Sequence, residues 1–500
     1  MNHWIIVPVV LPAIMGAFTL LALRHDLVLA RIFSVAATVA LLAVAAALLI
    51  ATSSAPPEVY RLGNWPAPFG IVLVLDRLSA LMVTLTALLA LVVQLYAIGT
   101  GWDGKGRHFH ALWQFQLMGV CGAFLTGDAF NLFVFFEVLL IASYGLMIHG
   151  GGRARLKAGV QYVAYNLVGS TLFLFALATI YSVTGTLNMA DLAAKLPQLP
   201  EGDFALIRVA GVMLLMVFAI KGALVPLQFW LPATYAQAPG PVSALFAVMT
   251  KVGAYAVIRC YTLFFSPALP ATGEMFADLL WIGALMTLAL GGIGVLGARS
   301  LGGLAAMAAV TSMGTLFLAV SQFSAVGLSA ALYYALHSTL AAAALFLITD
   351  MVGRRRGDVL LTAQGPIAQQ GLIATLFMAA AIAMAGMPPL SGFLGKLMVL
   401  DATRGPQIAL GWSFVLGSSF LVILGFARAG STLFWKSHET GGTPAPQASE
   451  PLAITAIGLL LAGLVALTVL AGPISDWMAD TAAALLDPSA YIAANTLGKR

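Results

Sequence analysis

Four ionisable side chains lie well inside long apolar stretches of this 500-residue sequence. One is a carboxylate, Glu137 in DAFNLFVFFEVLLIASY, and three are lysines, Lys221, Lys251 and Lys396. A charged group at the centre of a bilayer costs about 2.5–3.5 kcal/mol on insertion scales, and such residues mark ion and proton pathways. A purely structural ion pair could be replaced by apolar packing at little cost, so we expect these four to carry function. His337, in YYALHSTLAAAA, is a fifth candidate because imidazole exchanges protons near neutral pH.

Prolines beside two of the lysines predict interrupted helices. They lie at four positions, with Pro226 and Pro232 after Lys221, and Pro388 and Pro389 before Lys396. Proline removes a backbone donor and clashes with the preceding helical turn. Broken helices at membrane depth line cavities or ion sites, and a matching pair in two halves of a chain is typical of a repeated transporter unit.

The elements that must position these groups are membrane spans. Hydrophobic residues make up 61% of the chain and charged residues 9%, against about 25% charged residues in soluble domains. This composition excludes a soluble enzyme, a nucleic-acid-binding protein and a disulfide scaffold, and the continuous apolar runs exclude a transmembrane barrel. Cys121 and Cys260 form no C-x-x-C motif, and we expect neither a metal site nor a cofactor.

Fourteen stretches meet the requirement of about 20 mostly apolar residues for a spanning helix. They cover residues 5–22, 32–50, 71–98, 109–126, 130–148, 158–183, 206–232, 241–264, 275–297, 303–322, 326–350, 371–400, 408–434 and 451–472. We therefore predict an all-α, polytopic membrane protein with one integral membrane domain over residues 1–500. Its expected parts are spans 1–3 (1–107), a first five-span unit (108–265), a second five-span unit (275–435), and span 14 with a surface tail (451–500).

Lysines and arginines outside the spans are divided unequally between the two faces. Connections after odd-numbered spans hold 13 of them and the opposite face holds 8, while the other three of the 24 are the intramembrane lysines. The positive-inside rule then places the 13 in the cytoplasm and both termini outside. The first apolar stretch has no basic region before it and no A-x-A cleavage site, so we interpret it as a span.

Several other features receive structural interpretations. Asp128 precedes a helix start and is interpreted as an N-cap. His108 and His110 flank the fourth span and are expected at the membrane interface, and the run Arg354–Arg356 is a topology determinant. GIGVLG at 292–297 has a dinucleotide-binding spacing but lies in an apolar span with no preceding strand, so we discard it.

The charged positions and their contexts resemble the antiporter-like membrane subunits shared by Mrp cation/proton antiporters and respiratory complex I. The matching motifs are FFEVLL around Glu137, KGALVPLQFWLP at Lys221, APGPVSALFAVMTKVGAYA around Lys251 and GMPPLSGFLGK at Lys396. The resemblance runs from about Asp76 to about Trp435. It implies fourteen spans, two inverted five-helix repeats, discontinuous spans 7 and 12, and a central hydrophilic axis along which protons move.

Within that family the D-type subunits of Mrp (Mnh, Pha) antiporters are the most similar. M-type complex I subunits have a glutamate at the position of Lys396, and L and M types usually have a histidine at the position of Tyr235. L-type subunits and the A-type subunits of Mrp antiporters carry long C-terminal extensions that a 500-residue chain lacks. The N-type complex I subunit is the nearest competitor, since it also has a lysine in span 12.

The resemblance implies a proton-translocating component of a multi-subunit Na⁺(K⁺)/H⁺ antiporter in the bacterial cytoplasmic membrane, with the A, B, C, E, F and G subunits of the Mrp antiporter as partners. In our hypothesis Glu137 and Lys221 form a breakable pair, and the released proton passes through Lys251 and His337 to Lys396. Water and hydroxyls fill the gaps, with candidates Ser170, Thr250 and Ser391. The alternatives are a proton-pumping subunit of a NADH-quinone oxidoreductase or membrane-bound hydrogenase, and a lone carrier or structural scaffold.

Overall fold

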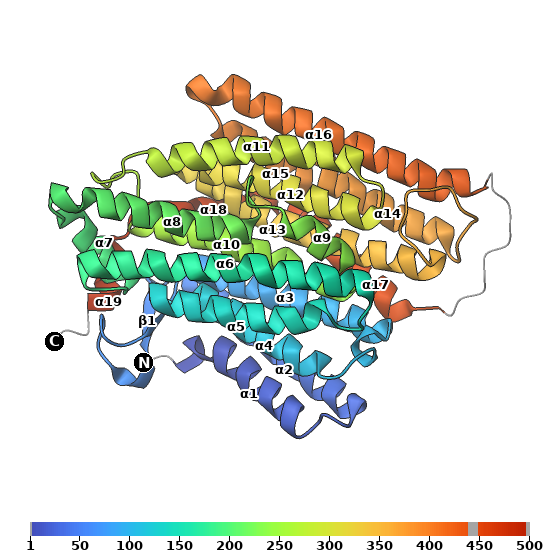
Figure 1. Cartoon of the computed structure of the whole chain (residues 1–500), viewed down its shortest axis with the longest axis horizontal. Helices are drawn as coiled ribbons and strands as arrows, with labels where there is room; N and C mark the ends of the chain where they lie inside the picture. Colours follow the sequence, from blue (N-terminus) through green and yellow to red (C-terminus); the bar gives the residue numbers. More distant parts are fainter. Residues whose placement is uncertain (1–2, 439–448, 497–500) are drawn as a thin grey trace.

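The computed structural model describes residues 3–438 and 449–496, and its longer helices run almost parallel to one another along the long axis (Figure 1). Eleven helices in these ranges are long and apolar enough to cross a membrane, and Val7–Leu21 and Gln370–Ala385 are shorter apolar helices. The predicted all-α membrane architecture is confirmed, whereas the number of fourteen spans stays a prediction. The helices are α1 (Val7–Leu21), α2 (Leu27–Thr52), α3 (Arg77–Gly99), α4 (Phe109–Leu125), α5 (Ala129–Met147), α6 (Arg153–Thr184), α7 (Met189–Lys195), α8 (Phe204–Gly222), α9 (Trp230–Gln237), α10 (Gly240–Leu263), α11 (Met275–Gly297), α12 (Leu301–Val320), α13 (Ala325–Arg356), α14 (Gln370–Ala385), α15 (Ser391–Ala402), α16 (Ile408–Gly430), α17 (Pro451–Val469), α18 (Ala471–Leu486) and α19 (Ser489–Thr496).

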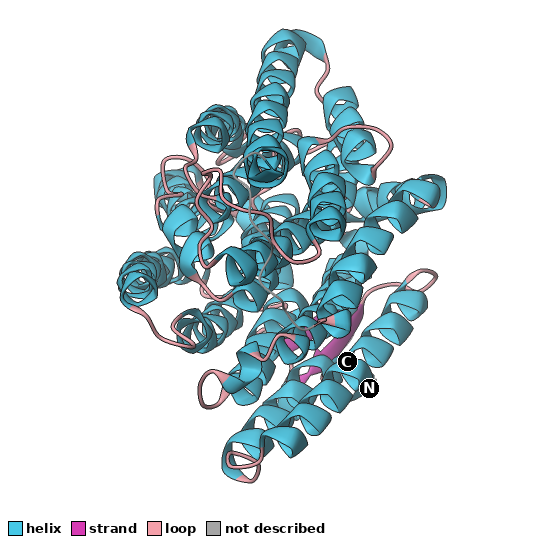
Figure 2. Ribbon diagram, turned by 90° about the vertical axis from the view of Figure 1, so that its right-hand side faces the viewer, coloured by secondary structure: helices cyan, strands magenta, loops and turns pink. Residues whose placement is uncertain are grey.

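The centre of the bundle is made of helices that are buried on all sides. Every residue of α10 is buried, and α13, which packs against it, is buried along most of its length. Peripheral helices instead expose large apolar side chains such as Ile50 on α2, Val168 on α6 and Phe420 on α16. Figure 2, which views the bundle from one end, shows helices surrounded by other helices rather than by a sheet. An apolar periphery around a fully buried centre is the arrangement expected of a protein in lipid.

A short antiparallel hairpin precedes α3 and corrects one predicted boundary. Strand β1 (Glu58–Arg61) pairs with β2 (Val72–Leu75), with Glu58 opposite Leu75. The third span was expected to begin at residue 71, but residues 72–75 are extended. Asp76 explains the change, because its carboxylate accepts from the backbone N–H of Ser79 and caps α3 in a capping box.

Two stretches expected to be single spans each contain two helices. Residues 223–229 between α8 and α9, and 386–390 between α14 and α15, are not helical. Both first helices end on a residue with positive φ, Ala223 at +54° and Gly386 at +77°. Three of the four candidate prolines, Pro226, Pro388 and Pro389, lie in these gaps.

The prediction that Pro232 helps to break span seven is wrong. It lies in the first turn of α9, Trp230–Gln237. Proline is tolerated there because the N–H groups of a first turn have no intrahelical acceptor. Pro232 therefore belongs to the start of the second helix rather than to the interruption.

The sequence suggested that the C-terminal tail lies at the surface, but part of it packs into the bundle. Helix α18 packs against α13 and buries Met478, Thr481, Ala482 and Leu485. These positions follow the i, i+3, i+4, i+7 spacing of one helical face. The tail therefore covers one side of the helix that carries His337.

Candidate functional site

The five candidate residues lie on five different helices around the centre of the bundle. Lys251 and His337 are on the two central helices and are only 2% and 1% exposed. Lys221 and Lys396 are also buried, and Glu137 is half-buried. Lys221 lies in α8 and Lys396 in α15, the helices that border the two interruptions. Lys251 lies on α10, which contacts both α8 and α13.

Helix α6 separates Glu137 from Lys221 in this structure. The Oγ of Ser170 donates to the Glu137 carboxylate, and Lys221 Nζ donates to Asn166 Oδ1 at 2.7 Å. Asn166 and Ser170 are four residues apart and therefore share one face of α6. Among the described residues no ion pair joins Glu137 to Lys221, although the two charges are within electrostatic reach of each other. The hypothesised contact between Glu137 and Lys221 is therefore not formed in the described part of the chain, and the breakable pair stays a hypothesis.

A small cavity borders the Lys221 ammonium. It is lined by Phe136, Tyr162, Asn166 and Trp230 among others, and it offers about 10 Å³ to the centre of a water molecule. This is about enough for one water. The indole N–H of Trp230, at the start of α9, donates to the carbonyl of Ile220 at 2.7 Å and so fixes α9 against the end of α8. A small, mostly apolar cavity with room for about one water therefore lies beside the lysine.

Lys251 has no hydrogen bond from its ammonium to any residue in the described ranges. Its neighbour Thr250 donates to the carbonyl of Ala247 in its own helix and does not bridge to another candidate. Near Lys251, helix α10 packs closely against the end of α8, because a Cβ on Gly253 would lie 2.6 Å from the backbone nitrogen of Gly222. A glycine at 253 is thus needed for this approach of α10 to the Lys221 segment.

The second interruption holds both His337 and Lys396. His337 Nδ1 lies 2.9 Å from Ser391 Oγ at the start of α15. Lys396 Nζ donates to the carbonyl of Ala385 at 2.7 Å and to Ser419 Oγ at 2.8 Å. Ala385 is the last residue of α14, and cations are favoured at helix C-termini. The ammonium groups of Lys251 and Lys396 are both within electrostatic reach of the His337 ring.

Sequence reasoning missed two direct partners of the lysines, Asn166 and Ser419. Both are uncharged, so neither stands out in an apolar span as a lysine does. The spacing of Asn166 four residues before Ser170 was the one available signal. Asp128, by contrast, is an N-cap as predicted, because it accepts from the backbone N–H of Asn131 at 2.8 Å.

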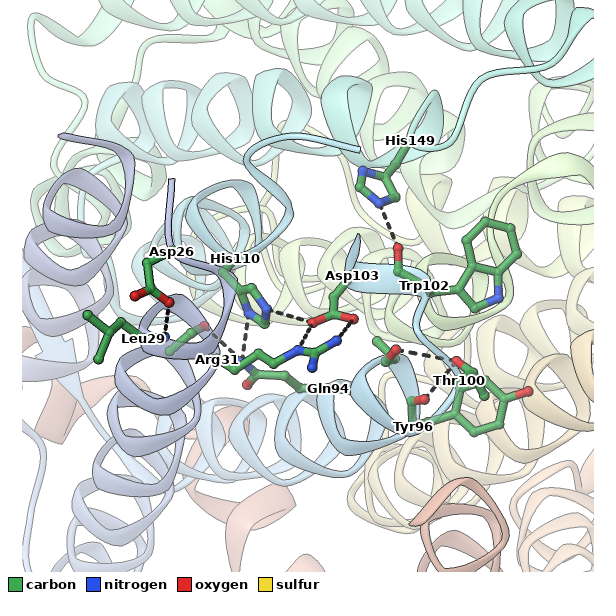
Figure 3. Close-up of polar contacts among 12 residues, drawn as sticks. Asp26, Leu29, Arg31, Gln94, Tyr96, Thr100, Trp102, Asp103, His110 and His149 are labelled. Atoms are coloured by element: carbon green, nitrogen blue, oxygen red, sulfur yellow. Dashed lines mark hydrogen bonds and ion pairs between the residues drawn. The ribbon is translucent and has the colours of Figure 1, made fainter. Parts of the chain in front are cut away.

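A second polar cluster lies where the start of α2, the end of α3 and the start of α4 come together (Figure 3). Arg31 holds Asp103 through two hydrogen bonds of 2.6 and 2.9 Å, and His110 Nε2 lies 3.1 Å from the same carboxylate. Burial opposes ionisation of Asp103, but the hydrogen bonds from His110 and Arg31 outweigh it and lower the pKa of Asp103 to about 2. His110, which the sequence placed at the membrane interface, is buried in the protein and contacts a carboxylate, and its depth in the membrane stays a prediction.

Arg259 is a fourth buried cation. The sequence analysis counted it among the basic residues outside the spans. It lies within α10, is 3% exposed, and pairs with Asp76 through contacts of 2.6 and 2.8 Å. Because this cation has a bidentate carboxylate partner at the end of the bundle near α19, it differs from the three lysines, for which the described residues supply no such partner.

Comparison with known proteins decides the family. Residues 126–422 match the sequence model described as NADH:quinone oxidoreductase/Mrp antiporter, TM, and this stretch includes all five candidate residues. The chain belongs to this family. It is 40% identical to a protein of Rhizobium meliloti (strain 1021) named as the D subunit of a probable K(+)/H(+) antiporter, over 98% of this chain and 96% of the relative.

Two further similarities extend over nearly the whole chain. The D subunit of the Na(+)/H(+) antiporter of Bacillus subtilis (strain 168) is 36% identical over 99% of both chains. A chain in the structure of the Mrp complex from Dietzia sp. DQ12-45-1b superposes with a TM-score of 0.88 at 28% identity, covering 99% of this chain and 100% of that one. The resemblance predicted from the motifs is therefore confirmed.

Proposed function

We propose that this protein is the proton-translocating D subunit of a multi-subunit Na⁺(K⁺)/H⁺ antiporter, and a transporter component rather than an enzyme. Two relatives named as D subunits of antiporters match it over at least 98% of its length. The alternative of a complex I or hydrogenase subunit remains as a related branch, since the family description names NADH:quinone oxidoreductase beside the Mrp antiporters. The partners are the A, B, C, E, F and G subunits, and the location is the bacterial cytoplasmic membrane.

The proton pathway is Glu137, Lys221, Lys251, His337 and Lys396. The observation that carries it is the position of His337, whose buried ring has a lysine ammonium within electrostatic reach on each of two helices, α10 and α15. Like charges in a poorly hydrated interior repel, so a proton that arrives at one lysine favours release from its neighbour. Lys221 moves between Asn166 and Glu137, and this movement opens or closes the entry to Lys251.

The two five-helix units are the frame for this pathway. Helices α4–α10 and α11–α16 each contain one interrupted helix as the fourth span of the unit. In each case a lysine adjoins the gap, Lys221 before the first and Lys396 after the second. An odd number of spans inverts the second unit relative to the first, and inverted repeats with broken helices at mid-membrane are a recurrent transporter design. The excess of basic residues on one face supports the proposal that both termini lie outside.

Everted vesicles that contain the whole complex, from a strain without its own antiporters, test this function. We expect Glu137→Ala, Lys221→Ala and Lys396→Ala each to abolish the Na⁺- or K⁺-dependent collapse of ΔpH at normal expression. Thr171→Val is the matched control, because Thr171 is exposed on α6 and bonds only the carbonyl of Leu167 among the described residues. Full activity of all three alanine variants would contradict the pathway.

A further inference from the structure

A cavity of about 430 Å³ lies at the end of the bundle that carries β1 and α19 (Figure 1). Its wall comes from four parts of the chain, within residues 55–57, 76–78, 259–263 and 481–491. We call it the end cavity, and its volume is enough for several water molecules. It lies on the face with fewer basic residues, which we propose is the outer one.

The wall of the end cavity contains an ion pair that is almost completely buried. Arg259 contacts both carboxylate oxygens of Asp76, and the two side chains are 4% and 12% exposed. The other charged residues of the wall lie further out, since Arg77 contacts the exposed Asp480 and Asp487 is itself exposed. A buried pair adds little stability compared with apolar packing, so its place on the wall of a cavity needs a functional account.

Helix α10 connects this ion pair to the centre of the bundle. Lys251, Tyr255 and Arg259 follow one another at intervals of four residues, so they lie along one face of the helix. Arg259 Nε donates to Tyr255 Oη at 3.3 Å, and this hydroxyl donates to the carbonyl of Phe124 at 2.6 Å. The distance along the helix axis from Lys251 to Arg259 is about 12 Å. A hydroxyl therefore lies between the central lysine and the ion pair.

Tyr491 on α19 brings a second hydroxyl to the same place. The centre of its ring lies 5.2 Å from the guanidinium carbon of Arg259. Its hydroxyl is buried, has no hydrogen-bond partner among the described residues, and is within electrostatic reach of Tyr255 and Asp76. Buried polar groups without a protein partner are commonly satisfied by ordered water. The side of the ion pair that faces Tyr255 is thus suited to hold water.

We propose that the end cavity is the outer mouth of the proton pathway, and that Asp76 is the carboxylate that exchanges protons with it. The inference rests on the proposed function, for which it names the place of exchange with the outer side. Arg259 keeps its charge, because a guanidinium is not deprotonated in proteins. While paired with Asp76 it is a fixed positive barrier between the cavity and Lys251, as an arginine is in pores that exclude protons.

Proton exchange at this mouth is balanced without any other reactant. The Asp76 carboxylate takes a proton from water in the end cavity and becomes a neutral acid, which weakens its attraction to Arg259. The acid then gives up this proton through water and the Tyr255 hydroxyl, which accepts one proton and donates another. A neutral Lys251 amine accepts it and becomes an ammonium, and the restored carboxylate pairs with Arg259 again. The reverse sequence releases a proton to the outside.

Thiol labelling of the assembled complex in intact cells tests whether the end cavity is open to outside water. Thr262 lines the cavity and is 4% exposed, so Thr262→Cys puts a thiol on its wall. The two native cysteines, Cys121 and Cys260, are replaced by alanine in this variant. We expect membrane-impermeant methanethiosulfonates to label it from outside. Thr86→Cys is the control and should stay unlabelled, because Thr86 is fully buried on α3 and is not a wall residue.

The charge of the attached group tests the proton exchange itself. Everted vesicles are prepared from the labelled cells, and the cation-dependent collapse of ΔpH is measured. We expect a trimethylammonium group on Thr262→Cys to abolish transport and a sulfonate group to reduce it much less, because a positive charge near Asp76 repels protons. Asp76→Asn should also abolish transport at normal abundance, and Asp76→Glu, which keeps a carboxylate, should restore it in large part.

The outcomes separate this proposal from the proposed function. Absence of labelling, full transport after labelling, or equal loss with both charges would overturn the outer mouth and leave the proton pathway intact. So would full transport by Asp76→Asn. Charge-dependent loss in Thr262→Cys, together with normal transport by Glu137→Ala, Lys221→Ala and Lys396→Ala, would support the outer mouth and contradict the pathway.

Discussion

Replacement of Asn166 by leucine tests most directly how the hydrogen bond to Lys221 contributes to proton transfer. Asn166 Oδ1 is the only described oxygen that accepts from the Lys221 ammonium, at 2.7 Å. A hydrogen bond to a charged group is worth about 1.5–3 kcal/mol, which corresponds to a factor of about 10 to 150 in a rate. Without it the ammonium turns to Glu137, which Ser170 now holds, and the separated arrangement is lost. We therefore expect proton-coupled cation transport to fall by about 10- to 150-fold.

The assay is the cation-dependent collapse of ΔpH in everted vesicles, normalised to the amount of assembled complex. Thr171→Val, on the same helix, removes an exposed hydroxyl that bonds the carbonyl of Leu167 and should transport like the wild type. Asn166→Gln, which keeps an amide acceptor, should recover part of the rate. Transport by Asn166→Leu at the rate of Thr171→Val would refute the role assigned to α6.

Two further substitutions test the second interruption and the Asp103 cluster. Gly386→Ala places a Cβ 2.6 Å from Lys396 Cδ at a φ of +77°. We therefore expect the free energy of unfolding to fall by about 1–2 kcal/mol and transport to be reduced. Gly371→Ala is the control and should change neither, because the space around Gly371 is open. Burial disfavours the Asp103 charge, but the hydrogen bonds from His110 and Arg31 lower the pKa of Asp103 from 3.8 to about 2, so the folded-state pKa lies below the unfolded one. The carboxylate then contributes about 2 kcal/mol at neutral pH that is lost as the pH falls from about 4 to about 2. Thermal unfolding of Asp103→Asn should accordingly differ most from the wild type at pH 7 and least near pH 2, and an equal difference at both would contradict this reasoning.

The candidate residues whose burial in a membrane costs much free energy could be identified from the sequence. Lys221, Lys251 and Lys396 stand out because an ammonium in hydrocarbon demands an explanation, and the structure buries all three. Asp128 was recognisable because a carboxylate before an apolar run is a local capping signal. Such features depend on the residue and its near neighbours in the chain, which a sequence displays directly.

Features that depend on how helices pack could not be predicted in the same way. Asn166 and Ser419 are ordinary in composition, and only the distances between helices make them partners of lysines. The pairing of Arg259 with Asp76 joins residues 183 positions apart. The run at 72–75 reads equally well as helix or strand, because a short apolar segment has no distinguishing period.

Lys251→Met in the assembled complex is the most direct measurement of the central claim, because the Lys251 ammonium has no hydrogen bond to any described residue. Methionine fills a similar volume and removes a buried charge, so the unfolding temperature should stay the same or rise. We predict that cation-dependent proton transport falls to background while the complex is at least as stable as the wild type. Lys195→Met, which removes a partly exposed lysine on α7, should leave transport unchanged. Full transport by Lys251→Met at normal abundance would contradict a proton pathway through this residue.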